Sequence, residues 1–256
     1  MHAVILAAGR GSRLGALAQD RPKCMVELAD SPLISRQIAA LRRGGVSNIG
    51  IVRGYRGNMI DIAGAAYFEN PRWAETNMVM SLVTAAEWLR SRPVIVSYAD
   101  IFYAHDIVKD LAASAGDLVV AYDRAWQSLW TRRFADPLSD AETFRTDPSG
   151  NLTEIGRRAT RIEEIEGQYM GLLKFTPAAY GAVQSVLASL DAKTRDSMDM
   201  TTLLRTLLNS GFPISTLGVS GHWGEIDSSA DLELYEKMIR QGELRLEAVG
   251  DEQRIR

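Results

Sequence analysis

Short, almost entirely apolar segments alternate with helix-like segments in the first half of the chain, and this alternation limits the fold more than any other feature. The apolar segments span residues 3–8, 48–53, 94–98 and 118–122. Strands buried on both faces of a parallel sheet have this composition. Residues with helical spacing lie between them, over 33–41, 78–89 and 106–115. The pattern predicts an α/β fold, a Rossmann-like three-layer α/β/α arrangement with a mixed, mainly parallel central sheet.

The pattern changes after residue 125. Residues 142–146 and 151–157 flank the turn-forming Asp147-Pro148-Ser149-Gly150, which predicts a hairpin within a small β-rich insertion. A further strand is expected over 168–175, and helices are expected from Thr176-Pro177 and over 198–209 and 229–240. We expect one domain over residues 1–242, with a first part of about 1–125 and a second of about 126–242. Residues 243–256 form a charged tail that we expect to fray.

Composition excludes several classes of protein. The 256 residues carry a formal net charge of −3, which disfavours a general nucleic-acid binder. Cys24 is the only cysteine, so an internal disulfide and a cysteine-rich metal site are excluded. The apolar run at the N-terminus has no basic region before it, and no stretch reaches the length of a membrane span. We therefore expect a cytoplasmic protein without a membrane partner.

The loop after the first strand has the chemistry of a phosphate-binding site. Leu6-Ala7-Ala8-Gly9-Arg10-Gly11-Ser12-Arg13-Leu14 is followed by Arg21-Pro22-Lys23. Glycines let the backbone approach an anion closely, and Arg13 and Lys23 add positive charge. It is not a P-loop, because no Gly-Lys-Ser/Thr follows, and Leu14 replaces the third glycine of a dinucleotide fingerprint. A plain tight turn is the alternative.

Two aspartates are candidate ligands of a magnesium ion. Asp100 follows the apolar strand 94–98, and Asp227 ends the segment Gly224-Glu225-Ile226-Asp227. Carboxylates at the carboxyl edge of a parallel sheet lie where such folds bind ligands, and Mg²⁺ prefers oxygen ligands. A turn or cap role for Asp100 and an N-cap role for Asp227 are the alternatives. Neither explains why both carboxylates follow strands.

These motifs together resemble those of the sugar-nucleotidyltransferase superfamily. The resemblance rests on the glycine loop with its downstream Pro22-Lys23, on Val96-Ser97-Tyr98-Ala99-Asp100, and on the segment around Asp227. It implies that the loop wraps the triphosphate of an NTP and that Mg²⁺ is held by Asp100 and Asp227. Arg13 and Lys23 would be the catalytic cations. The other implied nucleotide-binding residues here are Leu6, Ala7, Ala8, Gly9, Gly11, Ser12 and Ala99.

Within that superfamily the chain is most similar to bacterial choline-phosphate and 2-aminoethylphosphonate cytidylyltransferases. The similarity rests on Asn77-Met78-Val79-Met80-Ser81-Leu82 and on Gly54-Tyr55. It implies transfer of CMP from CTP to a small amine-bearing phosphate or phosphonate, with release of pyrophosphate. Tyr55, Asn77 and Ser81 would then bind the nucleotide, although Asn77 could equally cap the helix that it precedes.

The acceptor site is the least constrained part. A quaternary ammonium group is recognised by aromatic faces and a carboxylate. The candidate walls are Trp73, Trp126, Trp130, Tyr169 and Trp223, of which Trp223 is the best placed, and the candidate counter-charges are Glu225 and Asp199. Arg157 falls where the family holds the acceptor phosphate, but it departs from the family's usual Glu-Lys-Pro. A sugar-1-phosphate nucleotidyltransferase using UTP, GTP or CTP and a non-catalytic nucleotide-binding regulator are the alternatives. The acceptor, the role of 126–165 and the oligomeric state stay open.

Overall fold

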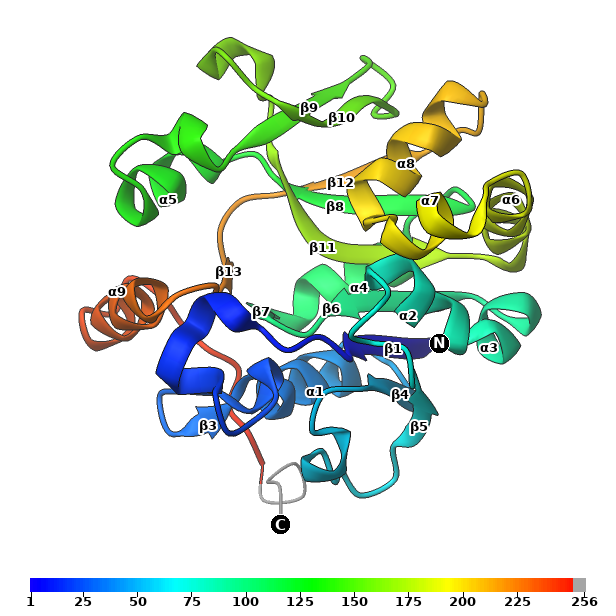
Figure 1. Ribbon diagram of the computed structural model, residues 1–256. Coiled ribbons are helices and arrows are strands. Elements are labelled where there is room, and N and C mark those ends of the chain that lie inside the picture. Colours follow the sequence, from blue (N-terminus) through cyan, green and yellow to red (C-terminus); the bar gives the residue numbers. More distant parts are fainter. Residues whose placement is uncertain (251–256) are drawn as a thin grey trace.

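Seven strands form the central sheet of the computed structural model, which describes residues 1–250 except for the side chains of Ser12, Arg13 and Ala16 (Figure 1). Their order is β12-β8-β11-β6-β1-β4-β5. All are parallel except β11, which runs antiparallel to both of its neighbours. The strands are β1 His2–Ala7, β4 Asn48–Arg53, β5 Ala66–Glu69, β6 Val94–Tyr98, β8 Leu118–Asp123, β11 Gln168–Phe175 and β12 Ser215–Val219. The mixed, mainly parallel sheet is therefore as predicted.

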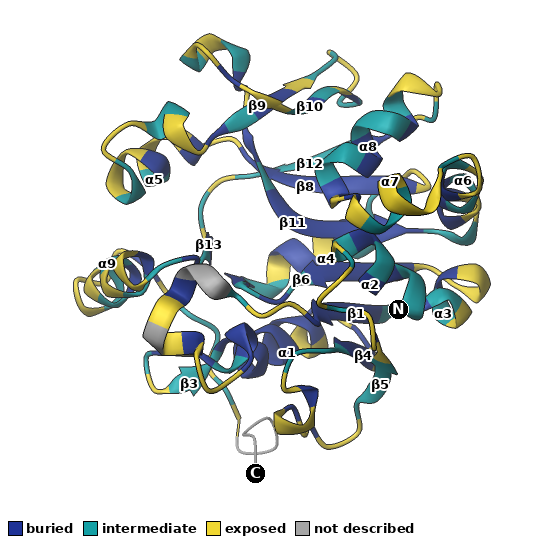
Figure 2. Cartoon of the chain, viewed as in Figure 1, coloured by how far each residue is buried: buried dark blue, intermediate teal, exposed yellow. Residues whose placement is uncertain are grey.

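Helices cover both faces of this sheet, which makes the three layers. They are α1 Leu33–Arg43, α2 Met78–Thr84, α3 Ala86–Ser91, α4 His105–Ala113, α5 Trp126–Arg133, α6 Pro177–Ala188, α7 Ala192–Ser197, α8 Met200–Asn209 and α9 Ser229–Arg240. Alternate residues of β1 face opposite layers: Ile5 packs with α1 and α4, whereas Val4 packs with α2, α3, α6 and α8. Figure 2 shows the central strands as the most buried part of the molecule.

Smaller strands lie outside the seven-stranded sheet. They are β2 Glu27–Leu28, β3 Ser31–Pro32, β7 Ile101–Tyr103, β9 Glu142–Thr146, β10 Leu152–Arg158 and β13 Trp223–Glu225. The hairpin of β9 and β10 and the helix α5 form the expected insertion between β8 and β11 (Figure 1). A short 3₁₀ turn, Lys23–Met25, follows the glycine loop.

Two local expectations differ from the structure. The helical segment 78–89 is divided into α2 and α3 at Ala85, whose backbone has φ −89° and ψ 19°. Residues 243–250 pack against the domain, where Leu244 is buried and Glu247 binds Arg43 and His105; the rest of the expected tail, 251–256, lies outside the described residues. None of the described helices is long and apolar enough to cross a membrane.

Candidate active site

Three carboxylates meet at the carboxyl edge of the sheet. Oxygen atoms of Asp100, Glu225 and Asp227 lie within 4.8 Å of one another. The antiparallel pairing of β7 with β13 brings these distant segments together, and Ile226 donates its backbone N–H to the carbonyl oxygen of Asp100 over 2.9 Å. Gln37 of α1 supports the same turn by donating to the carbonyl oxygens of Tyr98 and Ile101.

The cap alternatives for the two aspartates do not hold. Ser228 is the N-cap of α9 and shares a capping box with Asp231, so Asp227 is free of that role. Ala104 is the N-cap of the helix that follows Asp100. Helix capping therefore does not explain why the side chains of Asp100 and Asp227 meet in this cluster.

Lys23 supplies a positive charge to this cluster. Its Nζ atom donates to Asp100 Oδ2 over 2.8 Å and to Asp227 Oδ1 over 2.5 Å. Burial alone would lower the pKa of the ammonium group, but the two carboxylates outweigh it and raise that pKa. The Oδ1 atom of Asp100 is buried without a hydrogen-bond partner among the described residues. A cluster of hard oxygen ligands that still has a buried, unsatisfied anionic atom suits a hard divalent cation.

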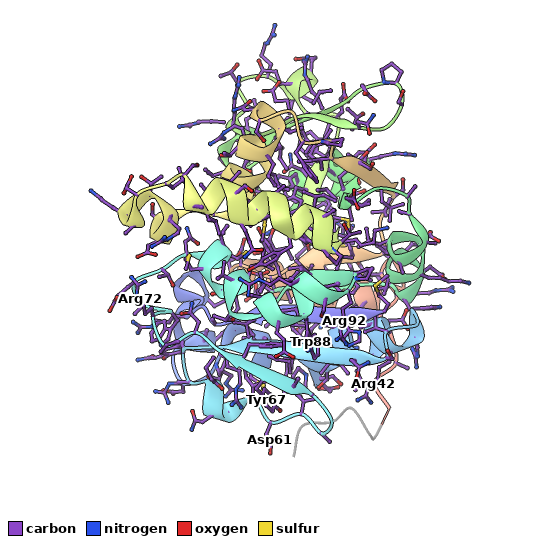
Figure 3. The ribbon with its side chains drawn as sticks, turned by 90° about the vertical axis from the view of Figure 1, so that its right-hand side faces the viewer. Arg42, Asp61, Tyr67, Arg72, Trp88 and Arg92 are labelled. Atoms are coloured by element: carbon purple, nitrogen blue, oxygen red, sulfur yellow. The ribbon has the colours of Figure 1, made fainter. Side chains whose placement is uncertain are left out.

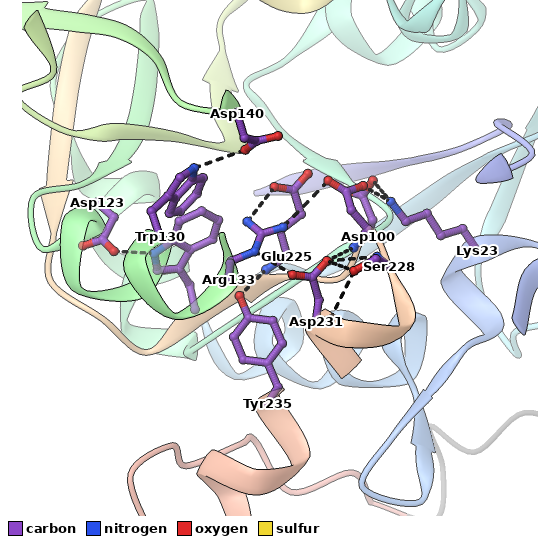
Figure 4. A network of polar contacts seen from close by, with 12 residues as sticks. Lys23, Asp100, Asp123, Trp130, Arg133, Asp140, Glu225, Ser228, Asp231 and Tyr235 are labelled. Carbon is purple, nitrogen blue, oxygen red and sulfur yellow. Dashed lines mark hydrogen bonds and ion pairs between the residues drawn. The ribbon is translucent and has the colours of Figure 1, made fainter. Parts of the chain in front are cut away.

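Arg133 of α5 lies on the other side of the cluster (Figure 4). Its side chain is fully buried; Nε donates to Asp231 Oδ1 over 2.8 Å, and Nη1 lies 3.4 Å from Glu225 Oε2. Burial, followed by the charges of Asp100 and Asp227, raises the pKa of Glu225 to about 8 despite Arg133 and Lys23. Glu225 therefore ionises less readily than an ordinary glutamate, as expected for a buried carboxyl group beside two like charges.

One cavity of about 290 Å³ extends from this cluster along the glycine loop and α2. It is lined by nine of the residues expected to bind the nucleotide: Leu6, Ala7, Ala8, Gly9, Gly11, Lys23, Asn77, Ser81 and Ala99. Gly11 has φ +67°, and a Cβ atom there would lie 2.8 Å from Lys23 Cβ, so the loop requires glycine. We refer to this cavity as the nucleotide pocket.

Tyr55, which was also expected at the nucleotide, lies outside that lining. Tyr55 packs edge-to-face on Trp73 and donates its hydroxyl to the carbonyl oxygen of Gln19. Tyr55 therefore contacts the segment that follows the glycine loop, at Gln19, from outside the pocket. The side chains of Ser12 and Arg13 lie outside the described part of the chain.

A second cavity, of about 310 Å³, adjoins the cluster on the side of the insertion. We refer to it as the acceptor pocket. Tyr169, Asp199 and Glu225 line it, as expected for an acceptor site. The antiparallel direction of β11 explains the place of Tyr169, because the beginning of β11 meets the edge where the parallel strands end. Gly171, at φ +75°, lets β11 pass the ring of Tyr98, which a Cβ atom would approach to 2.6 Å.

Trp223 and Arg157 do not line the acceptor pocket. Trp223 is a core residue, 2% exposed, whose ring packs on Trp130 and whose Nε1 atom donates to Asp123. Of the candidate tryptophans, Trp130 lines the pocket and Trp223, which was considered the best placed, does not. Arg157 is exposed on β10 and is likewise absent from the lining.

Three charged residues of the site were not expected from the sequence. Asp140 and Glu142 line the acceptor pocket, and Arg133 binds Glu225 and Asp231. All three belong to the insertion. The sequence groups acidic residues with Trp126, Trp130 and Phe134 in this segment, but that grouping does not show which side chains face the pocket. Glu225 was expected at the acceptor, and it lies in the carboxylate cluster as well as in the pocket lining.

Comparisons with known proteins agree with this geometry. Residues 3–158 match the family model of the MobA-like NTP transferase domain. The chain is 36% identical to the CTP:phosphoglutamine cytidylyltransferase of Campylobacter jejuni, over 91% of this chain and 98% of that protein. It is 35% identical to the choline-phosphate cytidylyltransferase of Streptococcus pneumoniae, over 37% of this chain and 43% of that protein.

A solved structure shares the fold. The inositol-1-phosphate CTP transferase from T. maritima superposes with a TM-score of 0.71 at 19% identity, over 93% of this chain and 95% of that one. Three observations lead to one assignment: the match to the family model, the near-complete alignment at 36% identity, and the two pockets around one carboxylate cluster. This chain belongs to the MobA-like NTP transferase domain family and is a nucleotidyltransferase.

Proposed function

We propose that the protein transfers CMP from CTP to a small acceptor that carries an amine and a phosphate or phosphonate group. The observation that carries this proposal is the carboxylate cluster with one pocket on each side. A nucleotide in one pocket and a phosphorylated acceptor in the other would meet at the cluster. Effective positioning of two bound reactants accounts for much of the rate enhancement in such a transfer.

The reaction is an in-line displacement at the α-phosphorus. An oxygen of the acceptor phosphate forms the new bond to Pα, and the bond from Pα to the bridging oxygen of pyrophosphate breaks. A phosphate monoester is largely ionised at neutral pH, so no general base is required. Lys23 would neutralise charge that develops toward the leaving pyrophosphate, and Arg13 is proposed for the same role.

The residues of the cluster fit Mg²⁺. Asp100, Asp227 and, from its place in the structure, Glu225 would hold the ion with the substrate phosphates completing the oxygen ligands. The bound ion would supply charge neutralisation at the phosphate oxygens. The backbone of the glycine loop would cradle the triphosphate, and Lys23 would exchange its contacts with the aspartates for contacts with the phosphates.

The acceptor pocket favours a cationic group. Beyond the cluster it is lined by Asp140, Glu142 and Asp199, and the described residues of its lining include no lysine, arginine or histidine. Burial raises the pKa of Glu142, and the nearby charges of Asp199 and Asp140 raise it further. An ammonium group would relieve this repulsion. Phosphoglutamine, the acceptor named for the Campylobacter relative, carries such a group and is the first acceptor to test.

A pyrophosphate-release assay tests the proposal. CTP, UTP, GTP and ATP would each be paired with phosphoglutamine, phosphocholine, 2-aminoethylphosphonate and glucose-1-phosphate. We expect turnover with CTP and at least one amine-bearing acceptor. Turnover with glucose-1-phosphate alone would overturn the acceptor proposal and favour the sugar-1-phosphate alternative, whereas no turnover with any pair would favour a non-catalytic role.

A further inference from the structure

The side-chain amide of Asn70 has only one orientation that satisfies its neighbours. Its Oδ1 atom accepts from the backbone N–H of Arg72 over 3.0 Å, and that group can only donate. The Nδ2 atom must therefore face the hydroxyls of Thr76 and Ser81, at 3.1 and 3.0 Å. Asn70 is buried, so water does not compete for these bonds. Both N–H groups of its amide are committed as donors.

This orientation decides the polarity of the two hydroxyls. Thr76 accepts from Asn70 and donates its own proton to the carbonyl oxygen of Arg72 over 2.8 Å. Ser81 also accepts from Asn70, but its proton has no acceptor among the described residues. Ser81 is 7% exposed and lines the nucleotide pocket. The Ser81 proton therefore has one hydrogen bond left to make, which an acceptor atom of a ligand would complete; a ligand donor could use only the second lone pair and would leave that proton unpaired.

The segment that carries these residues is held firmly. Arg72, at the margin of the face in Figure 3, donates from Nη2 to Asp196 Oδ2 over 2.6 Å. The backbone N–H of Asn77 donates to the carbonyl oxygen of Asp196 over 2.7 Å. These contacts join residues 70–77 to α7 and keep Asn70 in place beside α2.

We propose that Asn70 is a positioning residue that makes the Ser81 hydroxyl a donor to N3 of cytosine, and that this pair distinguishes CTP from UTP. The proposal rests on the proposed function, in which this pocket holds CTP. Lys23 and Asp100 bind the phosphate end, which leaves the lining of Thr76, Asn77 and Ser81 for the nucleoside. N3 of cytosine is an acceptor, whereas N3 of uracil carries a proton. The acceptor N3 of cytosine satisfies the Ser81 proton, whereas the N3–H of uracil leaves that proton without a partner.

The experiment compares kcat/KM for CTP, UTP and 3-deaza-CTP, in which N3 is replaced by C–H. The wild-type protein should favour CTP over each of the others by about tenfold or more, as expected for a site with one unmatched polar contact. Ser81→Ala should bring CTP and 3-deaza-CTP close to equality. Asn70→Asp, assayed at pH 8, replaces the two donors with an acceptor, so the Ser81 proton turns toward residue 70. UTP should then gain relative to CTP.

Two further variants keep the test sharp. Asn70→Leu, of similar size, frees the Ser81 hydroxyl without reversing it and should reduce the CTP/UTP ratio toward one. Thr84→Val is the matched control, because the Thr84 hydroxyl donates to the carbonyl oxygen of Ser81 on the same helix. It should retain the wild-type ratio.

The outcomes separate this inference from the proposed function. Absence of any CTP turnover in the wild-type protein would overturn the proposed function. Turnover of CTP with unchanged CTP/UTP and CTP/3-deaza-CTP ratios in the Asn70 and Ser81 variants would overturn the inference alone. Equal losses with CTP and UTP in Ser81→Ala would also overturn it, because a contact to O2 does not distinguish the two bases.

Discussion

The indole Nε1 of Trp223 donates a hydrogen bond to Asp123 Oδ2 over 2.9 Å, which ties strand β13 to the end of β8. Asp123 is 1% exposed. We expect Trp223→Phe to lower the free energy of unfolding by about 1–3 kcal/mol, because a buried carboxylate oxygen loses its partner. The ratio of kcat/KM between amine-bearing and amine-free acceptors should not change. Both quantities would be measured on the same variant, by urea unfolding and by steady-state kinetics. A kcat/KM ratio that falls to about one in the variant would show that Trp223 contributes to the acceptor site after all.

The carboxylate cluster predicts metal dependence. Asp100→Asn and Asp227→Asn should each reduce kcat by orders of magnitude and leave the circular dichroism spectrum unchanged, because each removes a hard anionic ligand. EDTA should abolish wild-type activity, and added Mg²⁺ should restore it. Asp106→Asn, which changes an exposed carboxylate on α4, is the control. Full activity of either cluster variant at saturating Mg²⁺ would exclude that residue from the metal site.

Lys23 offers a test of transition-state charge. Lys23→Ala should decrease kcat more than it increases the KM for the nucleotide, since the ammonium group acts on charge that develops toward pyrophosphate. Steady-state kinetics with varied CTP would measure both constants, with Lys109→Ala on the exposed face of α4 as the control. A change in KM alone would make Lys23 a ground-state binder.

The acidic lining of the acceptor pocket predicts selectivity for amines. Removing the amine, as in ethyl phosphate compared with phosphoethanolamine, should cost about tenfold or more in kcat/KM, or ~1.4 kcal/mol. Glu142→Gln should narrow that gap. Phosphocholine and phosphoglutamine belong in the same series. Equal kcat/KM across the series would exclude recognition of the amine.

The same pocket predicts a pH dependence. Because burial and then Asp199 and Asp140 raise the pKa of Glu142, part of its carboxylate charge appears only as the pH rises through that pKa. The KM of an aminated acceptor should therefore fall as the pH rises through the raised pKa of Glu142, above the ordinary range of a glutamate. In Glu142→Gln this fall should be smaller. An unchanged profile in the variant would assign it to another group.

The C-terminal segment predicts a second pH effect, on stability. Burial would raise the pKa of Glu247, but hydrogen bonds from His105 and Arg43 outweigh it and lower that pKa. The stabilisation is therefore present above the ordinary pKa of a glutamate and is lost as the pH falls through the lowered value. Glu247→Gln should lower the urea midpoint at pH 7 and approach the wild type near pH 4. Glu236→Gln, in an exposed pair with Arg240, should have little effect at either pH.

Local patterns were enough to predict most elements of the fold and the residues of the nucleotide pocket. Strands of parallel sheets and helix caps such as Thr176 and Ser228 are encoded in adjacent residues. The break at Ala85 was not predicted, because no glycine or proline marks it. The packing of residues 243–250 was also missed, since their charged composition conceals the tertiary contacts of Leu244 and Glu247.

The acceptor side could not be predicted to the same extent. Its residues come from α5, β9, β11 and α8, and sequence spacing does not indicate which side chains of separate elements face one cavity. Trp223 illustrates the difficulty: it lies two residues from Glu225 in sequence, yet it packs in the core behind the residues of the pocket lining.

The two ends of the insertion lie next to each other in the sheet, because Asp123 at the end of β8 pairs with Gln168 at the start of β11. A segment whose two ends are adjacent can be exchanged without changing the path of the surrounding chain. Grafting the corresponding segment of a relative in place of residues 124–167 would therefore replace Asp140 and Glu142 together with Arg133, while the glycine loop and Asp100 stay in place.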